Sequence, residues 1–129
     1  MDKILLLHPD SAIREKLTFV MQHSGFQVVS VSGARQAFLE ICKSSPDLIL
    51  MAEGSRKLNG DELCIRIREV SDALLIILGE DKNEAAGVNF LEMGADVYLT
   101  TPLNTRDLLA YARSRLRRYK ESLKEYERR

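Results

Sequence analysis

The stretch KILLLHPD, residues 3–10, contains the pattern on which the fold depends. Residues 4–7 form an unbroken apolar run, which is typical of a strand buried on both faces of a parallel sheet. Pro9 ends this strand, and Asp10 or Ser11 can cap the helix that follows. From 11 to 24 the apolar residues recur with a helical period, and Gly25 stops the pattern. The stretch therefore predicts one strand–helix unit.

The same alternation repeats along the rest of the chain. Further strands are expected over 27–31, 48–51, 74–78 and 97–100, and further helices over 34–43, 60–70 and 83–93. A last helix begins at Asn104, which can cap it together with Asp107. Five strands alternating with five helices predict an α/β fold with helices on both faces of a parallel sheet. Right-handed crossovers favour the flavodoxin-like strand order 2-1-3-4-5.

Length and composition indicate a single globular protein of the cytoplasm. The chain has 129 residues, of which 45% are hydrophobic, enough for a sizeable core. Its longest apolar run, 73–78, is far shorter than the ~20 residues of a membrane-spanning helix, and the run at 4–7 is too short for a signal peptide. Cys42 and Cys64 are isolated, so we expect two small core residues rather than a disulfide or a zinc site.

The net charge of zero hides a basic end. Residues 106–129 contain nine basic and four acidic side chains. A cluster of five lies within it: Arg113, Arg115, Arg117, Arg118 and Lys120. Because no DNA-binding motif or stacking aromatic accompanies this cluster, a solvated helix face is favoured, and a nucleic-acid accessory stays as an alternative.

The last helix has no stop signal after Asn104, so it is expected to exceed 30 Å. Its apolar stripe recurs every three or four residues: Leu109, Ala112, Leu116, Tyr119, Leu123 and Tyr126. The first three are needed to pack on the sheet. We therefore assign residues 1–118 to the domain and residues 119–129 to an extension of the last helix. The remaining three could pair with a second copy or form a solvated helical end.

Ligands of such sheets bind beyond the carboxyl ends of the strands. The residues at these ends are His8, Pro9, Asp10, Ala52, Glu53, Gly79, Glu80, Thr101 and Pro102. No phosphate-binding glycine loop follows the first strand, which leaves a nucleotide cofactor without support. His8 has no second metal ligand near it in this set, so we expect a hydrogen-bonded structural histidine and no metal site.

Four segments carry a resemblance to a known family: KILLL at 3–7, PDLILM at 46–51, Asn59-Gly60, and GADVYLTTP at 94–102. Over residues 2–118 the chain resembles the receiver domain of two-component response regulators. That resemblance implies a domain that phosphorylates its own aspartate with Mg²⁺ bound beside it. At the five positions that carry this chemistry the sequence instead has His8, Pro9, Ala52, Gly79 and Thr101. We therefore expect a degenerate, phosphorylation-independent receiver that is not an enzyme and binds no Mg²⁺.

Nearby carboxylates and cations leave an alternative open, in which the degenerate pocket still receives a phosphoryl group or an anion. Glu53 is turned away from the pocket by strand alternation, so a solvated carboxylate is expected, and Asp10 is expected to cap a helix. Glu80 could partly cover the pocket, and Arg56 with Lys57 could bind an anion.

The resemblance also implies a partner surface. Pro102, after Thr101, matches a position that is cis in receivers, and Tyr98 matches an aromatic whose ring moves when receivers switch. Without a threonine at position 79, we expect Tyr98 to stay in one state, where it either serves a surface or packs within the domain. The face formed by 83–93, 97–100 and the last helix is expected to bind a protein partner or a second copy. The expected function is an interaction module of bacterial signalling or transcriptional regulation. The extended last helix could lead into an output domain of a longer regulator, which the sequence leaves open.

Overall fold

The computed structural model describes residues 2–53, 60–79, 84–100 and 104–128, and its elements alternate between strand and helix. They are β1 (Lys3–Leu7), α1 (Ser11–His23), β2 (Gln27–Val31), α2 (Ala34–Ser44), β3 (Leu48–Ala52), α3 (Gly60–Val70), β4 (Leu74–Gly79), α4 (Glu84–Glu92), β5 (Val97–Thr100) and α5 (Thr105–Arg128). The strands pair in parallel in the order β2-β1-β3-β4-β5. The predicted flavodoxin-like fold and strand order are therefore confirmed.

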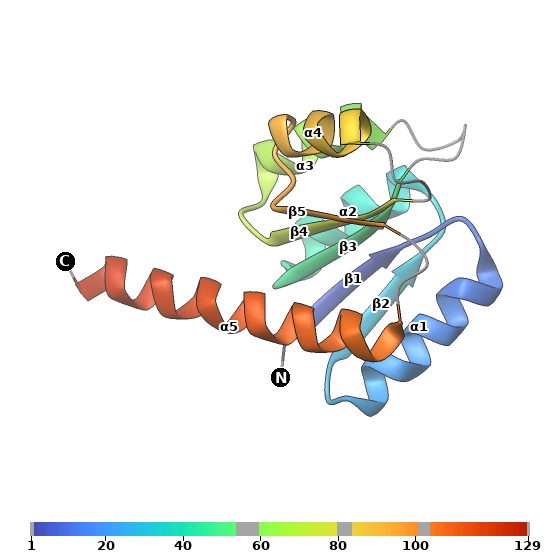
Figure 1. Ribbon diagram of the computed structural model, residues 1–129, viewed down its shortest axis with the longest axis horizontal. Helices are drawn as coiled ribbons and strands as arrows, with labels where there is room; N and C mark the ends of the chain where they lie inside the picture. The colour runs from blue at the N-terminus through green and yellow to red at the C-terminus, as the bar shows by residue number, and fades with distance from the viewer. Residues whose placement is uncertain (1, 54–59, 80–83, 101–103, 129) are drawn as a thin grey trace.

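The sheet separates two layers of core. Helices α2, α3 and α4 cover one face, and α1 and α5 cover the other (Figure 1). Successive residues of a central strand enter opposite layers, so that Leu5 belongs to the first and Leu6 to the second. Both are at most 1% exposed, which explains why this strand is apolar without interruption.

The expected elements lie where the sequence places them, with differences at their ends. β3 and β4 each continue one residue further than expected, to Ala52 and Gly79. Ala52 pairs with Leu78, so backbone pairing extends the ladder although alanine and glycine have low strand propensity. The assignment of Cys42 to the core is wrong, because it is exposed on α2, whereas Cys64 is buried as expected.

Helix α5 is 24 residues long, which at 1.5 Å per residue gives about 36 Å. Leu108, Ala112 and Leu116 are its buried residues, whereas Leu109 is only partly buried, so the buried stripe starts one residue earlier than expected. Residues 121–128 are all exposed, and Figure 1 shows this end of α5 projecting past the sheet. Within the described residues, no helix combines the length and the apolar character needed to cross a membrane.

Candidate functional site

The loop after β1 is held by its own side chains. The carboxylate of Asp10 accepts hydrogen bonds from the backbone N–H groups of Ala12 (2.9 Å) and Ile13 (3.1 Å), which caps α1 as predicted. The backbone N–H of Asp10 in turn donates to Nδ1 of His8 at 3.0 Å. His8 is thus a hydrogen-bonded residue of the turn.

The same loop is engaged by a cation that sequence reasoning missed. Nη1 of Arg14 donates to the carbonyl oxygens of His8 (2.8 Å) and Pro9 (3.3 Å). A long basic side chain in the first turns of a helix can reach back to the preceding loop. The position of Arg14, six residues after His8, could therefore have predicted this contact. The guanidinium places a positive charge against the backbone oxygens at the carboxyl end of β1.

The last residues of β3 and β4 have no polar or ionisable side-chain atoms. Ala52 is 4% exposed and is the last residue of β3, and Gly79 is the buried last residue of β4. The backbone N–H of Glu53 donates to the carbonyl of Leu78 at 2.7 Å, which keeps the two strand ends together. The other predicted residues, Arg56, Lys57, Glu80, Thr101 and Pro102, lie outside the described residues.

Glu53 is bonded to Tyr98. The hydroxyl of Tyr98 donates to Oε2 of Glu53 at 3.0 Å, in a partly buried position. The expectation of a solvated Glu53 is therefore wrong. Strand alternation does turn Glu53 away from the side of Ala52, but it turns it toward the sheet face on which Tyr98 of β5 lies.

Two glycines border the Tyr98 ring. A Cβ atom at Gly79 would lie 2.1 Å from the Tyr98 hydroxyl oxygen and 2.3 Å from Cζ. A Cβ atom at Gly87 of α4 would lie 3.0 Å from Cδ1 of the same ring. Phe90 stacks on Tyr98 with ring centroids 5.8 Å apart and an interplanar angle of 18°. The ring thus occupies the space beside Gly79 that a side chain at this position would need.

A second polar region lies at the amino ends of the strands. Four aspartates precede strands there: Asp2, Asp47, Asp72 and Asp96. Nζ of Lys120 on α5 pairs with the carboxylate of Asp2 and lies 3.9 Å from Oδ1 of Asp47. The hydroxyl of Tyr119 donates to the carbonyl oxygen of Asp72. Tyr119 and Lys120, which the sequence assigned to the extension, therefore contact the body of the domain.

These contacts raise the pKa of both Tyr119 and Lys120. The hydrogen bond to Asp2 raises the pKa of Lys120, with a further contribution from the charge of Asp47, against an opposing effect of desolvation. Burial is the main cause that raises the pKa of Tyr119, and the negative charges of Asp72 and Asp96 add to it. At neutral pH Lys120 is therefore charged and Tyr119 is protonated.

Arg68 of α3 joins the loops at the same edge. Its guanidinium donates to the carbonyl oxygens of Gly94 and Ala73, each at 2.6 Å, and to the carboxylate of Asp96 at 2.6 Å. Asp96 also accepts the backbone N–H of Leu75 at 2.8 Å. Gly94 has a φ of +115°, and a Cβ there would lie 2.6 Å from Cγ of Arg68. These bonds fix the starts of β4 and β5.

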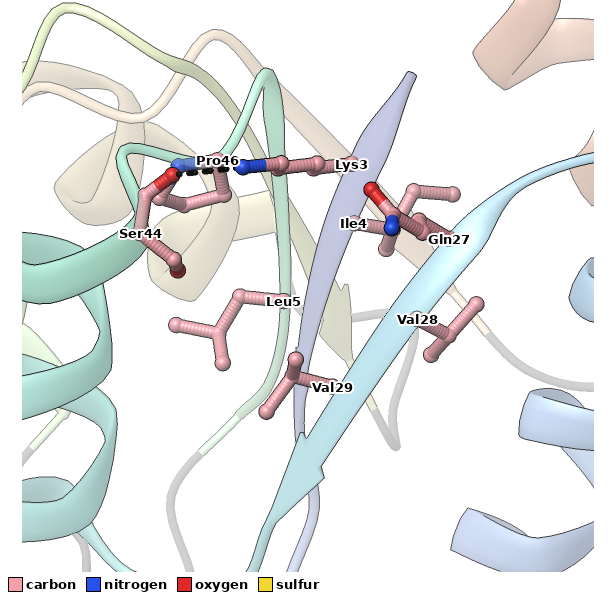
Figure 2. Close-up of a pocket in the computed structure, with 8 residues that line it drawn as sticks. All are labelled: Lys3, Ile4, Leu5, Gln27, Val28, Val29, Ser44 and Pro46. Atoms are coloured by element: carbon pink, nitrogen blue, oxygen red, sulfur yellow. Dashed lines mark hydrogen bonds between the residues drawn. The ribbon is translucent and has the colours of Figure 1, made fainter. Parts of the chain in front are cut away.

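A cavity of about 290 Å³ opens near the amino ends of β1 and β2. Figure 2 shows Leu5 and Val29 lining it, with Lys3 reaching the carbonyl oxygen of Ser44 at 3.4 Å. None of the residues predicted for the carboxyl edge lines this cavity. Among the described residues, no group of three His, Cys, Asp or Glu side chains is arranged to hold a metal ion.

Comparison with known proteins identifies the family. The family model of the response regulator receiver domain matches residues 4–113. The chain is 31% identical over 116 residues to the DNA-binding response regulator MtrA of Mycobacterium leprae, and 29% identical over 118 residues to the sensory transduction protein RegX3 of Mycolicibacterium smegmatis. These matches cover 90% and 92% of this chain but 52% of each relative, so the chain spans about half their length.

Solved structures agree with this assignment. A two-component response regulator from Clostridium difficile superposes with a TM-score of 0.88 at 27% identity, covering 92% of this chain and 98% of that one. The receiver domain of Klebsiella pneumoniae RstA has the same fold, with a TM-score of 0.84 at 24% identity, covering 90% of this chain and 99% of that one. The strand order, the two core layers and these matches agree, and the chain belongs to the response regulator receiver domain family.

Proposed function

We propose that this receiver domain acts without aspartyl phosphorylation, as a protein-interaction or dimerisation module in two-component-type signalling. The observation that carries the proposal is Ala52. It occupies the last position of β3, which matches the phosphoaccepting aspartate of the family, and it is 4% exposed. A methyl side chain has no oxygen to attack a phosphoryl group, so the covalent step has no nucleophile at this position.

The loop after β1 also does not fit Mg²⁺, which takes oxygen ligands and usually one or two carboxylates. His8 and Pro9 supply no carboxylate, and the carboxylate of Asp10 is committed to the cap of α1. The guanidinium of Arg14 already contacts the carbonyl oxygens of this loop and would repel a divalent cation. The proposal therefore includes no metal-dependent step and no enzymatic activity.

Exposed apolar side chains support a protein partner. Val88 and Leu91 of α4 are 52% and 46% exposed, and Tyr111 of α5 is 37% exposed. Further along α5, Leu123 and Tyr126 are 45% and 80% exposed. The exposed apolar side chains of α4 and α5 are thus places where burial by a partner or a second copy would be favourable.

Nucleic-acid binding is not part of the proposal for this domain. MtrA is described as DNA-binding, but this chain spans about half of it. In the basic cluster of α5, Nη2 of Arg113 donates to the carbonyl oxygen of Ser24 at 2.6 Å, and Lys120 pairs with Asp2. Two of the five cations are therefore engaged by the domain itself.

The test is to incubate the protein with acetyl phosphate and Mg²⁺, and to measure its intact mass and its oligomeric state by light scattering. A related receiver that retains the aspartate serves as the positive control. We expect no phosphoryl adduct and no change in oligomeric state. A stoichiometric adduct that disappears in Glu53→Gln or Asp10→Asn would overturn the proposal, and would favour unconventional phosphorylation instead.

A further inference from the structure

Building on the proposed function, we propose that Tyr98 permanently occupies the space beside Gly79 at the degenerate pocket, where Glu53 holds it. The hydroxyl of Tyr98 lies beside Gly79 at the carboxyl end of β4, bonded to the carboxylate that follows β3. Tyr98 thereby occupies the space that a phosphoryl group or an anion would need in order to approach Gly79. It locks β3, β4, β5 and α4 in one arrangement without a phosphoryl group.

The steric part of the lock rests on the two glycines. At Gly79 the distance of 2.1 Å from a built Cβ to the Tyr98 hydroxyl oxygen is far below van der Waals contact, so any side chain there excludes the ring. At Gly87 the distance of 3.0 Å to Cδ1 is tight, so a methyl group there would require the ring to shift by a few tenths of an ångström. Gly79 and Gly87 together therefore make room for the tyrosine.

The polar part of the lock is the bond to Glu53. A hydroxyl that donates to a carboxylate forms a charge-assisted hydrogen bond, which is stronger than a bond between neutral groups. An outward movement of the ring would break this partly buried bond. The stacking of Phe90 adds a favourable ring contact from α4.

With the lock in place, the Tyr98 side chain blocks access to Gly79. A phosphoryl group or an anion that approaches Gly79 has to expel the Tyr98 ring first, and breaking the bond to Glu53 opposes this. The lock also prevents the Tyr98 ring from projecting into solvent from the surface of α4 and β5. A partner of that face consequently meets one surface, whether or not a phosphodonor is present.

Fluorine NMR of the full chain labelled with 3-fluorotyrosine can test the lock. The chain has four tyrosines, and Tyr98→Phe assigns the resonance of interest. A soluble gadolinium chelate broadens each resonance according to its exposure, and Tyr126, which is 80% exposed, serves as the internal reference. We expect Tyr98 to be broadened several-fold less than Tyr126.

Two pairs of variants separate the steric and the polar parts. Gly79→Ser should raise the broadening of Tyr98 to that of an exposed tyrosine, whereas Gly33→Ser, where an added Cβ meets nothing within 4 Å, should leave it unchanged. Glu53→Ala should raise it in part, and Glu53→Gln, which keeps an acceptor oxygen, should raise it less. Circular dichroism checks that each variant is folded.

The outcomes distinguish the lock from the proposed function. Equal broadening of Tyr98 and Tyr126 in the unmodified protein, or unchanged protection of Tyr98 in folded Gly79→Ser and Glu53→Ala, would overturn the lock. Acetyl phosphate with Mg²⁺, added to the same sample, should leave the Tyr98 resonance in place. A phosphoryl adduct in that sample would contradict the proposed function even if Tyr98 is protected.

Discussion

The two edges of the sheet differ in how they hold the chain together. At the carboxyl edge, Ala52 and Gly79 have no polar side-chain atoms, and the ring of Tyr98 fills the space beside Gly79. At the amino edge, aspartates meet partners from α3 and α5, such as Arg68 and Lys120. The first edge is organised mainly by shape, and the second mainly by charge and hydrogen bonds.

This difference supports the proposed loss of the family's phosphorylation chemistry at the carboxyl edge. The carboxyl edge of a receiver needs carboxylates that are available to a metal and a phosphoryl group, and here the described carboxylates of that edge are bonded within the protein. The amino edge needs only to position α5 and the starts of β4 and β5. Its polar contacts hold α5 and the starts of β4 and β5 on the domain.

The largest effect is expected from removing the apolar anchor of α5, which lies between the two edges. Leu116→Ala should lower the free energy of unfolding by about 2–5 kcal/mol, because Leu116 is 2% exposed and its loss leaves a cavity. Leu123→Ala, one heptad further along the same helix, should change it by less than about 0.5 kcal/mol. Urea denaturation measures both, and equal losses would contradict the anchoring of α5 by its first half.

A smaller effect should follow from breaking the amino edge at Arg68. Arg68→Ala should cost about 2–3 kcal/mol, because it leaves the carbonyls of Gly94 and Ala73 and the carboxylate of Asp96 without their charged donor. Arg66→Ala is the matched control on α3, since its exposed pair with Glu62 is worth about 0.3–0.5 kcal/mol. If both variants lose the same stability in urea, the amino edge does not depend on Arg68.

The smallest effect concerns the contacts of Tyr119 and Lys120. Lys120→Met should cost about 0.2–1 kcal/mol at neutral pH, because the pair with Asp2 is partly exposed to solvent. The pKa values of Tyr119 and Lys120 are raised above their ordinary 10.0 and 10.5, so folding favours the protonated form of each. Their contribution is therefore fully present below the ordinary values and is lost as pH rises through the raised ones.

Urea denaturation at about pH 8 and about pH 11 tests this pH dependence. The stability difference between the unmodified protein and the double variant Lys120→Met/Tyr119→Phe should shrink at the higher pH. A difference that stays constant or grows would mean that the two groups do not stabilise α5 through their protonated forms.

Most of the fold could be predicted from periodicity, because strands buried on both faces are apolar without interruption and the helices between them have one apolar stripe. The capping role of Asp10 was also predictable, since the cap and the helix are adjacent in sequence. The position of Cys42 was not, because a small residue next to the buried Ile41 of α2 has no sequence signal for which side of the helix it takes.

For the candidate site, the sequence could predict which residues lie at the strand ends but not which of them contact one another. The sequence predicts Ala52 and Gly79 at strand ends, but not that Tyr98 lies against one of them. The bond from Tyr98 to Glu53 joins residues 45 positions apart, and the pair of Lys120 with Asp2 joins residues 118 positions apart. Such contacts depend on which strands become neighbours and on the direction of each side chain across the sheet.

The sequence by itself determined the order of elements, the receiver fold and the absence of an aspartate at position 52, because periodicity, caps and residue identity are local properties. The tertiary structure alone decided which groups meet at the two edges of the sheet. Parallel pairing of β3, β4 and β5 brings Glu53, Gly79 and Tyr98 together, and the packing of Leu116 brings Lys120 to the aspartates of the amino edge. These contacts require the closed fold, because each joins groups that only the assembled sheet and α5 place within hydrogen-bond distance.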